Sequence, residues 1–382
     1  MKRYTDKKRI FGLDIIRAFA IIFVVIGHGG FILDKTIFSG FPYFPMIDGV
    51  DLFFVLSGFL IGGILLKEFN KFEKIKTSQL LTFWKRRWFR TLPNYYLILL
   101  LNYLVVKYGI INEDINQFNF NFITFTHNFA SPFHGFFWES WSLSIEEWFY
   151  ILTPILIVAI SKFTSIKKTF LVSTMIMILM PILYRLLIFD DSIDSFWYGV
   201  TFRKVVLSRL DSIGYGLLAA WIYYYYHHIW KKYNVILFIL GIVLMVFIIN
   251  FDAAPNSFYK QIIYLSILPI SVVLIMPLAE SYKKAKGLIA YSIQHISKIS
   301  YSMYLINLAL VAEVIRDNFS PRGGFDGIFK YLLYWLIVIT VSSLLYKYFE
   351  KPVMNLRDKK YNLFSEVKHA LYSEDGTKNS EE

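Results

Sequence analysis

The first apolar stretch of the chain, GLDIIRAFAIIFVVIGHGG (residues 12–30), carries Asp14, Arg17 and His28, which hydrocarbon does not tolerate without a reason. Arg17 and His28 are eleven positions apart, so on a helix they share one face and lie about 16 Å apart along the axis. Asp14 lies one turn before Arg17. Glycines flank the histidine and leave room for a reacting group, and neutral imidazole is a natural general base near pH 7.

Each of these groups also has a purely structural interpretation. Asp14 and Arg17 would form an ion pair that snorkels to the membrane surface, and His28 would be a hydrogen-bonded histidine facing a neighbouring helix. We favour the general base for His28. For Asp14 the ion pair and a role in ligand binding both stay open.

The next apolar stretch is GVDLFFVLSGFLIGG (residues 49–63), with Asp51 near its start and small residues at helical spacing. Such spacing is typical of close helix packing. Asp51 is a second candidate for a polar group that faces the site.

A basic cluster follows in FWKRRWFRTLPNYY (residues 83–96), where Arg87 and Arg90 are three positions apart. Arginines at this spacing share a helix face and suit bidentate contacts with phosphates, and the interleaved aromatic residues suit stacking on a nucleotide ring. The alternative is an anchor of basic residues at the cytoplasmic membrane surface. We favour phosphate binding, because the cluster is dense.

Carboxylates recur in WESWSLSIEEWFY (residues 138–150). Ser144 and Glu147 have the spacing of a capping box, which would give Glu147 the structural task of closing a helix start. Glu146 lies four residues after Ser142 and shares its helix face. A carboxylate that orients a histidine is a sensible pairing, so we predict that Glu146 lies near His28.

The composition indicates what must position these groups. The chain has 382 residues, of which 56% are hydrophobic and 19% aromatic, and its mean hydropathy is +0.48, values typical of a polytopic membrane protein. It has no cysteine, so disulfides, thiolate catalysis and cysteine metal sites are excluded. The net charge of +12 comes from short clusters between apolar runs, which favours a membrane topology signal over nucleic-acid binding.

The apolar runs predict an all-α polytopic bundle of about ten transmembrane helices. The expected spans are 11–33, 48–67, 92–110, 145–161, 169–189, 206–226, 234–250, 260–280, 297–318 and 328–348. If both termini are cytoplasmic, 29 of the 40 Lys and Arg residues fall in segments on the inner side, which follows the positive-inside rule.

The longest connection on the outer side is 111–144, which contains histidines and carboxylates but no Lys or Arg. We expect it to be a lid on the acceptor side. Residues 1–350 are expected to form one transmembrane domain without a cleaved signal peptide. We expect residues 351–382 to form a polar, partly disordered cytoplasmic tail, and no second globular domain.

The chain resembles the acyltransferase-3 family of integral membrane acyltransferases, which modify extracytoplasmic carbohydrates and other acceptors. Seven stretches carry the resemblance in order: LDIIRAFAIIFVVIGH, GVDLFFVLSGFLIGG, RRWFRTLP, WSLSIEEWFYILTP, SRLDSIGYGLLAA, KISYSMYLIN and FEKPVMNLR. The family often has a histidine where this chain has Asn307. Some relatives also append a soluble hydrolase-like domain that is not expected here.

The resemblance implies transfer of an acyl group, expected to be acetyl, from cytoplasmic acyl-CoA to a hydroxyl of an extracytoplasmic carbohydrate. The protein would then reside in the cytoplasmic membrane. No metal and no tightly bound cofactor are expected, and acyl-CoA would be a co-substrate. His28 would deprotonate the hydroxyl or carry the acyl group itself, with Glu146 orienting its ring. The donor would be held by Asp14, Arg17, Arg87 and Arg90. The residues expected to support the acceptor side are Asp51, Trp141, Ser142 and Asp211.

Other functions fit parts of the pattern. A glycolipid or polysaccharide transporter would also have many helices with buried charges, but such proteins often have internal repeats, and we find no convincing one. The acyl acceptor could instead be a small molecule other than a carbohydrate. A regulatory or scaffolding membrane protein would have no need of Arg17, His28 and Glu146 on facing surfaces.

Overall fold

The computed structural model describes residues 9–40, 48–71, 77–251 and 253–356, and within these ranges the chain is helical and has no strand. The predicted all-α fold is therefore confirmed. Most of the predicted tail, from residue 357 onward, lies outside the described residues. A helix satisfies its own backbone hydrogen bonds, so an apolar segment can enter a bilayer in this form.

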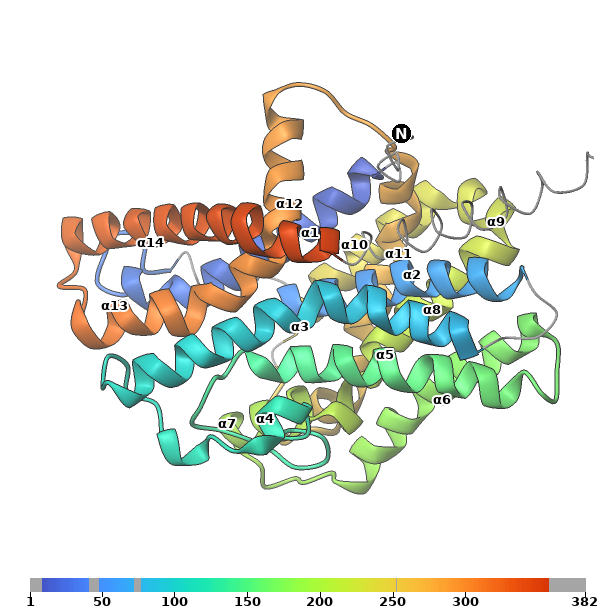
Figure 1. Ribbon diagram of the computed structural model, residues 1–382, viewed down its shortest axis with the longest axis horizontal. Helices are drawn as coiled ribbons and strands as arrows, with labels where there is room; N and C mark the ends of the chain where they lie inside the picture. Colours follow the sequence, from blue (N-terminus) through green and yellow to red (C-terminus); the bar gives the residue numbers. More distant parts are fainter. Residues whose placement is uncertain (1–8, 41–47, 72–76, 252, 357–382) are drawn as a thin grey trace, which may run out of the picture.

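The longer helices, which Figure 1 labels, are α1 (Phe11–Gly29), α2 (Gly49–Phe69), α3 (Thr77–Lys107), α5 (Ser140–Ile160), α6 (Ile166–Leu187), α8 (Val206–Tyr225), α10 (Asn234–Asn250), α11 (Leu265–Ser281), α12 (Leu288–Asn307) and α14 (Gly324–Leu345). Short helices α4 (Phe120–Thr124), α7 (Ser195–Tyr198), α9 (His227–Lys232) and α13 (Glu313–Asn318) connect them. Single π turns interrupt several helices, among them η4 (Gly199–Arg203) and η6 (Leu308–Ala312).

Seven segments among the described residues are long and apolar enough to cross a membrane. An eighth is formed if α7 and η4 are joined to α8 across a 59° bend. The count of about ten is not confirmed. Each predicted span does coincide with a helix, but α10 has only 17 residues, and α3 carries the basic cluster in its first half. Which end of the bundle faces the cytoplasm stays a prediction.

Among the helices that begin earlier than predicted, α12 starts at Leu288 and not at residue 297, and two others bear on the site. α3 starts at Thr77 and not at residue 92, so the basic cluster lies within the helix and not before it. α5 starts at Ser140, with Glu139 at its N-cap, so the capping-box interpretation of Ser144 and Glu147 is wrong. The first turns of α3 and α5 are polar. Helices predicted from apolar runs therefore begin too late when contacts with other helices hold such polar turns.

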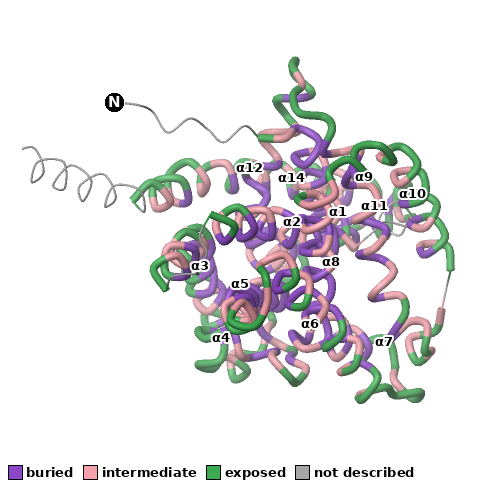
Figure 2. Tube along the Cα trace, turned by 90° about the vertical axis from the view of Figure 1, so that its right-hand side faces the viewer, coloured by how far each residue is buried: buried purple, intermediate pink, exposed green. Residues whose placement is uncertain are grey.

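The centre of the bundle is built from α1, α2, α5 and α8, whose buried segments cluster in the middle of Figure 2. α2 and α8 cross at Gly58 and Gly216. A Cβ atom on Gly58 would overlap the carbonyl oxygen of Ile213, and one on Gly216 would overlap that of Val55. The expected close helix packing is therefore confirmed at Gly58.

α1 packs against α12 and α2 along its length. Its first turn carries Asp14 and its last turn carries His28. The helix therefore joins two polar regions of the bundle, which we call the Arg17 cluster and the His28 cluster and define below.

Candidate active site

The His28 cluster consists of His28, Asn307 and Tyr334, from α1, α12 and α14. His28 Nδ1 lies 2.6 Å from Asn307 Oδ1. The Tyr334 hydroxyl donates to the carbonyl of Val25 at 3.1 Å and lies 3.4 Å from the same Asn307 oxygen. A Cβ atom on Gly29 would overlap the Tyr334 ring, so a glycine beside His28 allows this approach. Asn307 is fully buried and His28 is half-buried.

The contacts of Asn307 fix the tautomer of His28. Both protons of the Asn307 amide nitrogen are used, because Nδ2 donates to the carbonyls of Met303 and Tyr304 at 2.8 Å each. The amide oxygen therefore faces the imidazole, and a carbonyl oxygen can only accept. Nδ1 must carry the proton of the neutral ring, which leaves the lone pair on Nε2 available to accept a proton or to attack an electrophile.

A buried acid, Glu139, contacts residues on both sides of Asn307. Its carboxylate accepts from the backbone N–H of Ala309 at 3.3 Å, and its carbonyl accepts from the Tyr304 hydroxyl at 3.0 Å. Ser142 donates to that hydroxyl at 2.6 Å. Burial, and secondarily the nearby carboxylate of Glu113, raises the pKa of Glu139 to about 8.

Charged groups surround the His28 cluster on the same side of the bundle. Asp48 caps α2 through the N–H of Val50 at 2.9 Å and forms an ion pair with Arg203. Lys204 lies over the Trp138 ring, with Nζ 4.5 Å from the centroid, and its charge acts on His28.

The Arg17 cluster lies at the other end of α1 and consists of Arg9, Asp14, Arg17, Arg90 and Glu146. Asp14 forms its ion pair with Arg9 and also accepts from the Ser297 hydroxyl at 2.8 Å. Arg17 lies within electrostatic reach of the other four groups. The ion pair considered for Asp14 and Arg17 is therefore replaced by one between Asp14 and Arg9. The cluster carries three cationic side chains.

Glu146 does not pair with His28, and this part of the sequence-based prediction is wrong. Glu146 accepts from the Ser57 hydroxyl at 2.8 Å and from the Tyr150 hydroxyl at 3.1 Å, and it interacts with the charges of Arg17 and Arg90. The ring partner of His28 is Asn307. α5 begins earlier than predicted, so Glu146 lies more than one turn into the helix, away from the end that carries Glu139.

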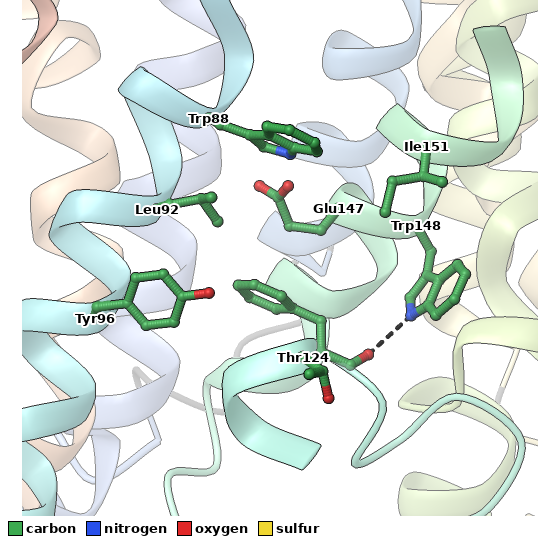
Figure 3. Close-up of a pocket in the computed structure, with 8 residues that line it drawn as sticks. Trp88, Leu92, Tyr96, Thr124, Glu147, Trp148 and Ile151 are labelled. Atoms are coloured by element: carbon green, nitrogen blue, oxygen red, sulfur yellow. Dashed lines mark hydrogen bonds between the residues drawn. The ribbon is translucent and has the colours of Figure 1, made fainter. Parts of the chain in front are cut away.

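Glu147, the next residue, lines a cavity of about 170 Å³ between α3 and α5. In Figure 3 its carboxylate points toward Trp88 and Leu92 of α3, and Tyr96 lies farther along the same wall. The carboxylate accepts from the Thr91 hydroxyl at 2.6 Å. Arg87 acts electrostatically on Glu147, whereas Arg90 acts on Glu146.

The remaining predicted residues form contacts within the bundle, and their predicted acceptor-side roles stay predictions. Asp51 forms a buried ion pair with Arg209 and accepts from Ser212 at 3.1 Å. Asp211 pairs with Arg185 at 2.8 Å, and both side chains have no exposed surface. The Trp141 ring meets Phe54 edge to face. Ser142 connects to the His28 cluster through Tyr304, whose backbone carbonyl accepts from Asn307.

Sequence reasoning missed the contributions of Asn307, Glu139 and Tyr334. Asn307 stood out only as a departure from the family pattern, and Glu139 only as a carboxylate in a long connection. Their contacts with α1 and α12 join segments far apart in the chain. The one local signal is the sequence WES before α5, where an acid precedes the helix start. Among the described residues, no three His, Cys, Asp or Glu side chains are grouped to hold a metal ion.

Comparison with known proteins gives a consistent result. A family model described as an acyltransferase domain matches residues 10–347. An O-acetyltransferase of Staphylococcus aureus, OatA of strain NCTC 8325 / PS 47, is 28% identical over 379 residues, which cover 93% of this chain and 58% of the relative. A putative O-acetyltransferase of S. aureus strain COL is 27% identical over 371 residues, with 92% and 58% covered. The chain thus spans just over half the length of these relatives. No solved structure matches it.

Proposed function

Because the chain belongs to the acyltransferase family whose domain model matches residues 10–347, we propose that it is a membrane O-acetyltransferase. It moves an acetyl group from acetyl-CoA on the cytoplasmic side to a hydroxyl of a carbohydrate on the outer side. The names of the relatives support the acetyl group and the ester linkage. The observation that carries the proposal is the Nε2 lone pair of His28, which the contact with Asn307 leaves available.

In the direct route, His28 acts as a general base. The acceptor hydroxyl gives its proton to Nε2 while its oxygen attacks the thioester carbonyl, and the C–S bond breaks as the ester C–O bond forms. The proton on Nε2 then passes to the departing thiolate. The products are an ester and free CoA thiol, so no proton is gained or lost overall.

In the covalent route, Nε2 itself attacks the thioester carbonyl and expels the thiolate. The hydroxyl then attacks the resulting acyl-imidazole, and its proton balances the thiolate. Both routes need the same lone pair. Mass spectrometry of the protein after exposure to acetyl-CoA without acceptor distinguishes them, because only the covalent route leaves an acetyl group on the peptide that contains His28.

The Arg17 cluster supports a donor site at the opposite end of α1. It gathers cationic side chains of the kind that bind phosphates, and Arg87 lies one turn from Arg90 on α3. Arg17 and His28 are about 16 Å apart along the helix axis. An extended pantetheine arm spans a distance of this order, so the CoA phosphates would bind near the arginines while the thioester reaches His28.

The test of the reaction uses cells that lack the gene, complemented with the full chain or with His28→Gln. We expect surface glycans to carry a base-labile acetyl ester with the wild-type chain and to lose it with His28→Gln at equal protein abundance. Mass spectrometry of the glycans gives the readout. Unchanged acetylation by the variant would refute the role of His28.

The test of the donor site measures acetyl-CoA binding by the purified protein. Replacing both Arg87 and Arg90 by alanine should weaken binding at least tenfold, because each phosphate contact contributes about 1.5–3 kcal/mol. Lys85→Ala is the control, since Lys85 lies two positions before Arg87 and five before Arg90 on the same helix, and so on a different face. Equal affinities for all three proteins would contradict a donor site at α3.

A further inference from the structure

A second cavity, of about 190 Å³, lies in the connection between α3 and α5. Exposed polar side chains form its rim, among them Gln117, Asn121 and His134, and its floor is formed by the buried rings of Phe122, His127 and Phe133. A cavity of this size is smaller than the 300–1,000 Å³ typical of drug-sized ligands, so it suits one ring of a larger molecule.

The rim presents hydrogen-bonding groups that the fold does not use. Gln117 donates from Nε2 to Asp114 at 3.2 Å, which leaves its carbonyl oxygen to accept another bond. Within the described part of the chain, the Asn121 side-chain amide and the His134 imidazole form no hydrogen bond. These three side chains offer donors and acceptors together, which is what a ring that carries several hydroxyls requires.

Aromatic rings supply the complementary apolar surface. On the floor, the ring of His127 stacks on Phe122 with centroids 4.3 Å apart, and Phe133 meets His127 edge to face at 4.8 Å. Beside the rim, the exposed rings of Phe196 and Trp197 contact His134 at 6.4 and 6.1 Å. Polar rims with aromatic faces suit sugar rings, whose C–H faces are apolar and whose edges carry hydroxyls.

The cavity is connected to the His28 cluster through Trp138. The Trp138 ring lies 6.1 Å from Phe133 and 6.4 Å from Phe196. Its other neighbour is Lys204, whose charge acts on His28. A chain that occupies the cavity and continues past Trp138 would therefore reach Lys204, one of the charged groups on the His28 side of the bundle.

The absence of basic residues from the cavity lining favours a neutral ligand. No lining residue is Lys or Arg, the connection 111–144 has neither, and Glu113 and Asp114 lie in it. Burial lowers the pKa of His127 to about 4, so the floor is uncharged at neutral pH. An anionic sugar ring in the cavity would meet no Lys or Arg among the lining residues and would lie near the Asp114 carboxylate, which accepts from Gln117 of the rim.

We propose that this cavity binds one sugar ring of a neutral oligosaccharide acceptor, at a position away from the hydroxyl that His28 acylates, with Phe196 and Trp197 as a platform for a neighbouring ring. The inference rests on the proposed function, since it assigns the acceptor of the same reaction. It predicts that the enzyme acts on a chain of sugars in preference to a single sugar.

Binding is measured on the purified full chain in detergent by isothermal titration calorimetry, with cellotetraose and chitotetraose as neutral probes and tetragalacturonic acid as the anionic probe. We expect wild-type protein to bind a neutral tetrasaccharide, and the anionic probe to bind at least tenfold more weakly. The double variant Asn121→Ala/His134→Ala should weaken neutral binding about tenfold, which is the loss of one to two hydrogen bonds. Asn116→Ala is the control, because Asn116 is an exposed residue of the same connection outside the cavity.

The outcomes separate this inference from the proposed function. Binding of neither neutral probe by wild-type protein, or equal binding by wild-type protein and the double variant, overturns the sugar site even if acetyl transfer is found. Preference for the anionic probe overturns the charge argument. In a transfer assay, the double variant should raise KM for the tetrasaccharide about tenfold and leave kcat nearly unchanged. A loss confined to kcat would also contradict a binding role.

Discussion

Asn307 acts on His28 through an oxygen that can only accept a hydrogen bond, so its removal should scramble the tautomer while leaving the imidazole in place. We predict that Asn307→Ala lowers kcat by about a hundredfold or more and changes KM little, because wrong-tautomer defects in comparable histidine sites cost up to about 10⁴-fold. Steady-state kinetics with acetyl-CoA and an acceptor sugar provide the measurement.

A purely structural role would give a different result. Asn307→Asp retains an acceptor toward Nδ1 and should recover a substantial part of the activity, whereas Asn307→Leu should not. The melting temperatures of all three variants should be compared with that of wild type. If all three variants lose activity to the same extent, and in proportion to their fall in melting temperature, then Asn307 supports the fold and does not set the tautomer of His28.

Glu139 offers a prediction about pH. Burial, and then Glu113, raises its pKa to about 8, whereas an unfolded chain has a value of about 4.3. Between these pH values the folded protein holds a proton that the unfolded chain has released, so this group makes the free energy of unfolding fall as pH rises. Glu139→Gln removes the titration and keeps an acceptor for the N–H of Ala309. The melting temperature of the variant, relative to wild type, should therefore increase from pH 5 to pH 8.

The comparison is sound because other titrating groups, such as His127, are shared by both proteins and cancel in the difference. Differential scanning fluorimetry in detergent at pH 5, 6.5 and 8 gives the three values. A difference that stays constant over this range would mean that Glu139 is ionised throughout and that burial does not hold its proton.

At the scale of the helix, the crossing of α2 and α8 depends on glycine. A methyl group at Gly58 would overlap the backbone of α8, whereas Gly63 of the same helix has no atom within 4 Å of an added Cβ. We predict that Gly58→Ala destabilises the protein, since overpacking a tight contact costs about 1–3 kcal/mol. Gly63→Ala should behave as wild type. Yield and peak shape in size-exclusion chromatography, together with melting temperature, would show the contrast, and equal behaviour of both variants would refute it.

The elements that could be predicted from the sequence are those with a strong local signal. Apolar runs placed a helix in each predicted span, and the spacing of Arg17 and His28 placed them along one helix that connects two polar clusters. The early start of α3 could not be predicted from apolarity, because its first turns are basic and polar. The same holds for the serines that open α5.

The partners in the site were harder to predict than its central residue. His28 follows from its glycine neighbours and its place in an apolar helix, but its bond to Asn307 depends on how α1 packs against α12. The error at Glu146 has the same origin. A helix that starts a turn earlier than expected changes which acid lies near the histidine, and here it is Glu139 that supports Asn307.

At the scale of the whole molecule, the predicted orientation can be tested with single cysteines, because the native chain has none and gives no background. Ile37 follows α1 at the His28 end and is 86% exposed, and Phe163 joins α5 to α6 at the opposite end and is 87% exposed. If the N-terminus is cytoplasmic, a membrane-impermeant maleimide should label Ile37→Cys in intact cells and Phe163→Cys only after permeabilisation. The reverse pattern would invert the topology and place the proposed donor site on the outer side.

The bond between His28 and Asn307 also has a consequence for biogenesis. Its partners are 279 positions apart in the chain, so the first helix enters the membrane long before the ribosome has made the second partner. During that interval no amide fixes which ring nitrogen of His28 carries the proton. The hydrogen-bonded pair is therefore complete only once α12 has been synthesised and packed against α1, and a truncated product that ends before α12 should lack the proposed transfer activity.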